Sequence, residues 1–129
     1  MRLTFLTISA AVVVAALGTA SPALACSCAF MSEEEHLEKS DLVFEGTVVK
    51  TRAVDETPDG PWRDLITKFM VTRTVKGDEA QTREIHHHRN NGANCGINFE
   101  DERAYRVYAH RSESGFSTNS CSNTQPLEK

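Results

Sequence analysis

The sequence lacks a surplus of positive charge, a C-x-x-C motif and a recognisable catalytic motif. Its 14 lysines and arginines are outnumbered by 18 aspartates and glutamates, so the formal net charge is −4. A nucleic-acid partner is therefore not expected, because a basic surface supplies most of such binding. The absence of C-x-x-C argues against redox chemistry. Since no serine lies in a nucleophile elbow and no nucleophile has an evident base, we expect a protein that is not an enzyme.

The longest apolar run lies within the first 25 residues. Arg2 precedes an apolar core from Leu3 to Leu17, and small residues then lead to Ala23-Leu24-Ala25, an A-x-A cleavage pattern. We interpret residues 1–25 as a cleaved signal peptide, which implies a secreted or periplasmic protein without a membrane span. A retained membrane anchor is one alternative, although the core is short of the roughly 20 residues that a span needs. Lipidation at Cys26 is another alternative, because lipoprotein signals also end just before a cysteine.

All four cysteines, Cys26, Cys28, Cys95 and Cys121, follow this leader. An even number of cysteines in an exported chain indicates two disulfides. A bond between Cys26 and Cys28 would close a very small ring, so the two long-range pairings remain open. Four thiolates on a zinc ion are a weaker alternative, because the spacing does not resemble paired zinc knuckles. Cleavage after Ala25 would leave Cys26 first, with a free α-amino group and a carbonyl that form a bidentate metal ligand.

The remainder of the chain, residues 26–129, reads as one domain. Ser32 and Glu35 form a capping box that predicts a helix over about residues 33–39. Runs of β-branched and aromatic residues predict strands over residues 41–50, 62–75, 83–89, 104–110 and 116–121. Because there are no repeats and no α/β alternation, the pattern suits a small barrel or a sandwich. We predict a mainly β fold, a five-stranded OB-fold-like barrel with one or two short helices and two disulfides.

Details of two strands refine this prediction. Gly46 within the first strand predicts a bulge or sharp bend. Alternation along the second strand places six side chains on one face, and these are Leu65, Thr67, Phe69, Val71, Arg73 and Val75. In the fourth strand the same rule places Tyr105, Val107 and Ala109 on one side.

Short motifs are spread over nearly all of residues 26–129. They are Cys26-Ser27-Cys28, Ser40-Asp41-Leu42-Val43, Phe69-Met70-Val71, Val75-Lys76-Gly77, Cys95-Gly96, Tyr105-Arg106-Val107-Tyr108 and Thr118-Asn119-Ser120-Cys121-Ser122. Taken together, they resemble the netrin-like family, and within it the N-terminal domain of the tissue inhibitors of metalloproteinases. The Cys-x-Cys start followed by a Cys-Gly and a final cysteine is the most specific part of this resemblance.

The resemblance implies both a fold and an activity. It implies an OB-fold barrel with Cys26 paired to Cys95 and Cys28 paired to Cys121. In inhibitors of this family the first residue, here Cys26, binds the catalytic zinc of the protease through its amine and carbonyl. The second residue, here Ser27, enters the pocket for the residue after the scissile bond. The other implied protease contacts are Cys28, Ala29, Ala93 and Asn94. The expected partner is a zinc metalloprotease of the metzincin class, bound by a monomer that has no cofactor of its own.

The chain also departs from the animal inhibitors. It lacks the third disulfide that they carry in this domain, and the segment from Thr51 to Pro61 has no obvious match. A non-inhibitory netrin-like binding module of the periplasm or cell envelope is therefore the alternative function.

Three further features have more than one interpretation. His86 and His88 share a face of a strand and could bind zinc or copper there, but no carboxylate or cysteine is clearly placed to complete such a site. We therefore expect His86-His87-His88 to be a solvated run.

Trp62 is interpreted either as a contact residue or as the cap of a barrel end. Phe30 and Met31 either line the binding surface or pin the N-terminal segment to the barrel.

Overall fold

A computed structural model of the chain describes residues 26–54 and 64–128. The predicted signal peptide, residues 1–25, and Trp62 lie outside the described residues. The elements are α1 (Glu33–Lys39), β1 (Leu42–Ala53), β2 (Asp64–Lys76), β3 (Thr82–His88), β4 (Ala104–Ser112), β5 (Gly115–Ser117) and β6 (Gln125–Pro126). The predicted mainly β fold is confirmed, and the helix has the predicted bounds.

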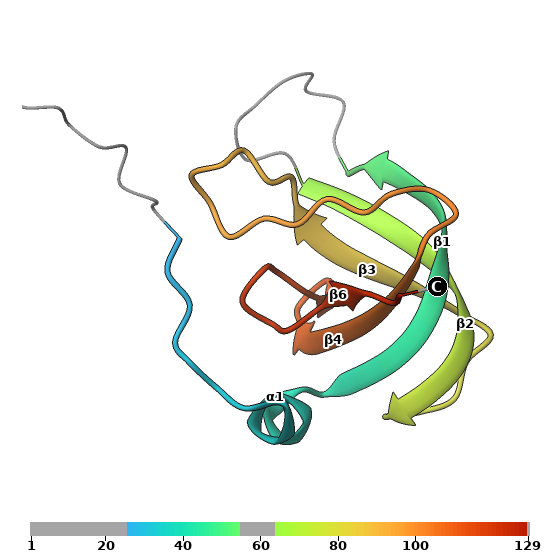
Figure 1. The fold of residues 1–129 in the computed structure, drawn as a ribbon. Helices are drawn as coiled ribbons and strands as arrows, with labels where there is room; N and C mark the ends of the chain where they lie inside the picture. Colours follow the sequence, from blue (N-terminus) through green and yellow to red (C-terminus); the bar gives the residue numbers. More distant parts are fainter. Residues whose placement is uncertain (1–25, 55–63, 129) are drawn as a thin grey trace, which may run out of the picture.

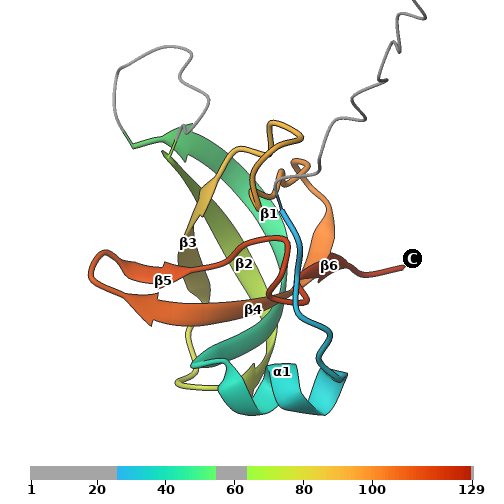
Figure 2. The ribbon, with the colours of Figure 1, turned by 90° about the vertical axis from the view of Figure 1, so that its left-hand side faces the viewer.

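The strands form a single sheet that curls into a ring (Figures 1 and 2). The order around the ring is β1-β2-β3-β5-β4, and a second pairing between β4 and β1 closes it. The β3–β5 pair is parallel, while the other pairs of the ring are antiparallel. The short strand β6 adds to β4 outside the ring. The predicted five-stranded OB-fold-like barrel is therefore confirmed.

The ring closes because β1 bends and pairs with β2 on one side and β4 on the other (Figure 1). The β1–β2 register shifts between Glu45 and Gly46, which confirms the predicted bulge. A Cβ atom at Gly46 would lie 2.8 Å from the carbonyl oxygen of Met70. Only glycine therefore allows the two backbones to approach so closely at this bend.

The barrel interior is filled by an apolar cluster with Phe69 at its centre. The Phe69 ring is fully buried and makes edge-to-face contacts with Phe44, Phe99 and Tyr105, at centroid distances of 5.4, 5.1 and 6.4 Å. Such contacts are favourable for aromatic rings beyond the area they bury. The other buried members of the cluster are Leu42, Val48, Ile85, Val107 and Ala109.

The prediction that one face of β2 points into the barrel is confirmed for the first half of the strand and wrong for its end. Leu65, Thr67 and Phe69 are buried, but Arg73 and Val75 are exposed. The reason is that β2 pairs with β3 only from Asp64 to Met70 and then runs past the end of β3. The predicted inner side of β4 is confirmed, since all three of its residues are buried.

Helix α1 begins at the predicted capping box. The Glu35 amide donates to the Ser32 hydroxyl (3.2 Å), and the Ser32 amide donates to the Glu35 carboxylate (2.8 Å). At the other end, the Lys76 ammonium group donates to the backbone carbonyls of Leu37 (2.9 Å) and Glu38 (2.8 Å). This bond joins the C-terminal turn of α1 to the end of β2, where a cation also suits the helix dipole.

Ion pairs join α1 to three strands. Glu45 on β1 accepts hydrogen bonds from Arg73 on β2 (2.9 Å) and Arg106 on β4 (2.7 Å), and Arg106 also pairs with Glu33 of α1 (3.0 Å). The two guanidinium groups lower the pKa of the Glu45 carboxyl group below its usual value. Because α1 follows directly on residues 26–31, these contacts fix the far end of that segment.

The predicted strand over residues 116–121 is too long. The chain leaves the sheet after Ser117, because the Thr118 hydroxyl donates to the Tyr108 carbonyl (2.8 Å) and bonds the Thr124 hydroxyl (2.8 Å). These side-chain bonds close a loop over residues 118–124 before β6. A side chain that satisfies backbone groups in this way competes with strand pairing.

Candidate functional site

Three segments that are far apart in the sequence meet at one edge of the barrel. They are residues 26–31 at the start of the described chain, residues 89–97 after β3, and residues 118–124 between β5 and β6. We call them together the disulfide ridge. Figure 2 shows the first segment running beside the β5–β6 connection toward α1. Two disulfides link it to the other two segments.

The disulfides are Cys26–Cys95 and Cys28–Cys121, each with a Cα–Cα distance of 5.2 Å. This is the pairing that the resemblance implies, and it is confirmed. The two bonds also contact each other, because the Cys121 sulfur lies 3.8 Å from the sulfurs of both Cys26 and Cys95. The first residues of the described chain are thus held by one continuous cluster of sulfur atoms.

A zinc site made of cysteine thiolates is excluded by this pairing. The sulfurs of Cys26, Cys95 and Cys121 lie within 4.8 Å of one another, close enough to share an ion. However, all four cysteines are oxidised to disulfides. A sulfur atom in a disulfide is not a thiolate, and the thiolate is the form that binds zinc.

Asparagine side chains hold the segment over residues 89–97 in shape. The Asn94 carbonyl oxygen accepts from the Gly96 amide (3.1 Å), and its NH₂ group donates to the Arg89 carbonyl (2.9 Å). Asn91 accepts from the backbone amides of Ala93 (2.9 Å) and Asn94 (3.0 Å). Such bonds between an asparagine side chain and nearby backbone groups favour turns over strands.

Gly96 has a steric reason to follow Cys95 directly. A Cβ atom at this position would lie 2.5 Å from the Arg89 carbonyl oxygen, which is a clash with backbone. Any other residue would therefore push the two arms of the loop apart. Because Cys95 directly precedes Gly96, that displacement would also move the disulfide to Cys26.

The segment over residues 118–124 contributes two residues that sequence reasoning did not assign to the site. The Asn119 side chain accepts from the Cys121 amide (2.8 Å), and the Ser120 amide donates to the Cys95 carbonyl (2.9 Å). The second bond ties two segments of the ridge together independently of the disulfides. Both residues belong to a motif of the resemblance, Thr118-Asn119-Ser120-Cys121-Ser122, which is the signal that could have identified them.

The predicted contact residues differ in how far they are exposed. Ser27, Cys28, Ala29 and Ala93 are exposed, whereas Cys26 and Asn94 are half-buried. The disulfide joins Cys26 to Cys95, the residue that follows Ala93 and Asn94 in the sequence.

Phe30 does not pin the N-terminal segment to the barrel, because its side chain is 99% exposed. This rules out one of its two interpretations. Met31 behaves differently, since it is half-buried and its sulfur lies 3.5 Å from the Lys39 ammonium group of α1. The segment therefore presents an unburied aromatic ring immediately before the point where it joins the helix.

His87 lies inside the barrel beneath the ridge, so the prediction of a solvated histidine run is wrong for this residue. It is 4% exposed, its Nε2 atom bonds the Thr67 hydroxyl (2.7 Å), and its Nδ1 atom lies 2.8 Å from the Ile97 carbonyl oxygen. A carbonyl only accepts, so Nδ1 carries the proton. Burial lowers the pKa of the His87 ring, against a smaller opposing effect of the hydrogen bond to Ile97. The ring is therefore neutral and joins the barrel to the ridge.

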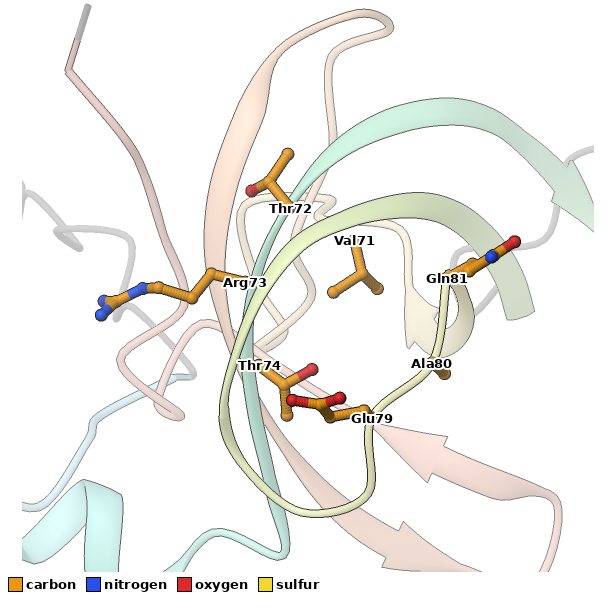
Figure 3. A pocket seen from close by; sticks show the side chains of 7 residues that line it. All are labelled: Val71, Thr72, Arg73, Thr74, Glu79, Ala80 and Gln81. Atoms are coloured by element: carbon orange, nitrogen blue, oxygen red, sulfur yellow. The ribbon is translucent and has the colours of Figure 1, made fainter.

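A separate hollow of about 490 Å³ lies between the second half of β2 and the β2–β3 connection (Figure 3). Its walls are Val71, Thr72, Arg73, Thr74, Glu79, Ala80 and Gln81. In Figure 3 the Arg73 side chain extends away from the others, consistent with its ion pair to Glu45. None of the predicted contact residues lines this hollow, so it does not belong to the candidate site.

No protein-family model matches the chain, and no curated protein matches it either. Within residues 26–54 and 64–128, no helix has the length and apolar character that a membrane crossing requires.

Proposed function

We propose that the protein is a secreted inhibitor of zinc metalloproteases of the metzincin class and acts through Cys26 as its mature first residue. The motifs that resemble the tissue inhibitors of metalloproteinases support this function. A catalytic zinc keeps one position open for water or substrate. In the proposed complex, the α-amino nitrogen and the carbonyl oxygen of Cys26 chelate the zinc and displace the water, and the metal expands from four to five ligands. The inhibitor supplies no metal or cofactor of its own.

The chemistry of an α-amino group suits this role. Its pKa in a peptide is about 7.7–8.0, far below that of a lysine side chain. A metal ion competes with the proton for the amine, so binding releases one proton. Inhibition should therefore strengthen as the pH rises toward about 8.

The observation that carries the proposal is the anchoring of Cys26 and Cys28 by two disulfides that contact each other at 3.8 Å. Association costs free energy whenever flexible groups become ordered at an interface. Here the first residues are covalently attached to two segments that side-chain hydrogen bonds already hold in shape. Most of the ordering cost is thus met during folding and not during binding.

The surroundings of Cys26 also suit a protease cleft. Ser27 and Ala29 are small and exposed, so they fit pockets of different depth. Ala93 and Asn94 directly precede Cys95, which is bonded to Cys26. Phe30 adds an exposed aromatic ring, the type of residue that often contributes most of the energy of an interface.

The decisive experiment compares two oxidised proteins against a metzincin catalytic domain with a fluorogenic peptide substrate. One protein begins at Cys26, and the other carries one added alanine before Cys26. We expect the first to inhibit and the second to bind at least about a hundredfold more weakly, a loss of roughly 2.7 kcal/mol. Lys68→Ala is a matched control, because Lys68 is exposed on β2 and is not part of the ridge.

Mass spectrometry of both proteins checks the first residue, the absence of a lipid and the two disulfides. If both oxidised proteins leave a panel of metzincins fully active, the proposal fails, and a netrin-like binding module of the cell envelope becomes the better hypothesis. If both inhibit equally, the inhibition does not depend on the free amine, and the proposed mechanism is wrong.

A further inference from the structure

The three consecutive histidines of β3 have two different environments. His87 points into the barrel, and both of its ring nitrogens are engaged by Thr67 and Ile97. His86 and His88 point to the opposite face, since side chains alternate along a strand. They are half-buried and exposed, respectively. Two imidazoles are therefore available on one outer face of β3.

A carboxylate lies directly beside His88. Asp64, the first residue of β2, is the register partner of His88, and its Oδ1 atom lies 2.6 Å from the His88 Nδ1 atom. Sequence reasoning found no carboxylate for these histidines, because β2 and β3 are neighbours only in the fold. With Nδ1 donating to the carboxylate, the lone pair of the neutral ring is on Nε2. Histidines that bind metals are held by such a carboxylate in the same way.

His86, His88 and Asp64 line the same surface hollow of about 280 Å³. The hollow is also lined by the end of β4, by the β4–β5 connection and by residues at and after the end of β5, and the remaining lining residues are Leu65, His87, Ser112, Ser114, Ser117, Thr118 and Asn119. The His86 ring lies beside Gly115, because a Cβ atom built at that glycine would be 3.9 Å from the His86 Nε2 atom. Apart from Leu65, the residues that line the hollow are polar, and the hollow is large enough for an ion with several waters.

We propose that His86 and His88 together bind one divalent transition-metal ion, zinc or copper, with Asp64 orienting the His88 ring. Residues two apart on a strand are separated by about 6.6 Å. Imidazole nitrogens bind zinc at about 2.0–2.1 Å, so both rings reach one ion once His86 turns toward His88. Water completes the coordination shell. Imidazole suits zinc and copper, and copper binds more tightly to a given set of nitrogen ligands.

Zinc titration of the oxidised protein, prepared without a histidine tag, tests this site. Calorimetry should give one ion per chain. His86→Ala and His88→Ala should each weaken binding at least about tenfold, and Asp64→Asn about tenfold, as expected for a group that orients a ligand. The matched control is His110→Ala, because His110 lies on β4 and does not line the hollow. It should leave the affinity unchanged.

A second measurement uses the unmodified protein and does not depend on the variants folding. In NMR spectra, zinc should shift the ring resonances of His86 and His88 and leave those of His36 and His110 in place. Copper should give an electron paramagnetic resonance spectrum with coupling to two imidazole nitrogens. A chain with one added alanine before Cys26 should behave identically, which separates this site from the N-terminal amine.

Two outcomes would overturn the inference. One is zinc affinity that is the same in His86→Ala, His88→Ala and the unmodified protein, which would place the ion elsewhere. The other is the absence of any ring shift at millimolar zinc. Neither experiment includes a protease, so the result is independent of the proposed inhibitory function.

Discussion

The barrel core and the disulfide ridge are stabilised in opposite ways. The core around Phe69 is held by apolar packing, with five of its side chains completely buried. The ridge is largely exposed and is held by two disulfides and by asparagine side chains that bond the backbone. A surface that must remain exposed for contact with a partner cannot be stabilised by burying its own apolar groups. Cross-links and local hydrogen bonds are the means that remain.

His87 connects the two regions. One ring nitrogen bonds Thr67 in the barrel, and the other bonds the backbone of Ile97, two residues after Cys95. His87 thus joins the barrel to the segment over residues 89–97, as Thr118 joins it to the segment over residues 118–124. The comparison of core and ridge leads to four predictions, from the largest expected effect to the smallest.

Phe69→Ala should have the largest effect, because it empties the centre of the core. Removing a fully buried phenylalanine costs about 3–5 kcal/mol through lost apolar burial and the cavity that remains. Urea unfolding measures this loss. Met70→Ala is the matched control, since the Met70 side chain is 51% exposed, and it should change stability by no more than about 0.5 kcal/mol. Equal losses in the two variants would contradict this description of the core.

Replacing Cys28 and Cys121 together by serine should destabilise the protein by about 2–4 kcal/mol. Unlike Phe69→Ala, it should leave the folded barrel intact and loosen only the ridge. Hydrogen exchange should therefore accelerate in residues 26–31 and 118–124 while the β1 and β2 amides remain protected. If protection is lost uniformly over the barrel, the ridge and the core are not separate in the way proposed.

Acidification tests the junction between the two regions. Because the pKa of His87 is lowered in the folded state, the unfolded chain takes up a proton that the folded chain does not. The contribution of His87 to the free energy of unfolding is complete above about pH 6.5. Below that pH it is lost, by no more than about 1.4 kcal/mol for each pH unit. His87→Gln should remove this slope between pH 5 and 6.5, whereas His110→Gln should keep it. An unchanged slope in His87→Gln would show that another group titrates.

Asn94→Ala should have the smallest effect on global stability, about 0.5–1 kcal/mol, because its hydrogen bonds lie in a surface loop. Its local effect should be larger, with faster amide exchange over residues 89–97. If the ridge binds a protease, the inhibition constant should also rise. Asn98→Ala, which removes a single bond to the Asn90 amide (3.1 Å), should have a smaller effect on each measurement. The reverse ranking would contradict the role given to Asn94.

Much of the fold was predictable because its signals are local. Ser32 and Glu35 marked the start of α1, and Gly46 marked the bulge in β1. The predictions of strand ends and buried faces were wrong where a contact with another strand decides the structure. Thr118 ends β5 because it bonds Tyr108 on another strand. The end of β2 is exposed because β3 stops pairing with it at Met70.

The candidate site was also predictable only in part from the sequence. The Cys26-Ser27-Cys28 motif and the motif around Cys121 identified two of the segments that form the disulfide ridge. The contributions of Asn119 and Ser120 were not predictable from their residue types, since asparagine and serine occur in most loops. Their roles follow from the Cys95 carbonyl and the Cys121 amide that they contact.

By itself, the sequence determined the helix, the approximate strands and the barrel class, since capping, alternation and turn chemistry act between residues that are close in the chain. Only the tertiary structure decided that the two disulfides contact each other, that His87 is buried while His86 and His88 are not, and that Asp64 lies beside His88. These facts depend on which strands become neighbours when the sheet closes, and that is settled by the packing of the whole barrel around Phe69.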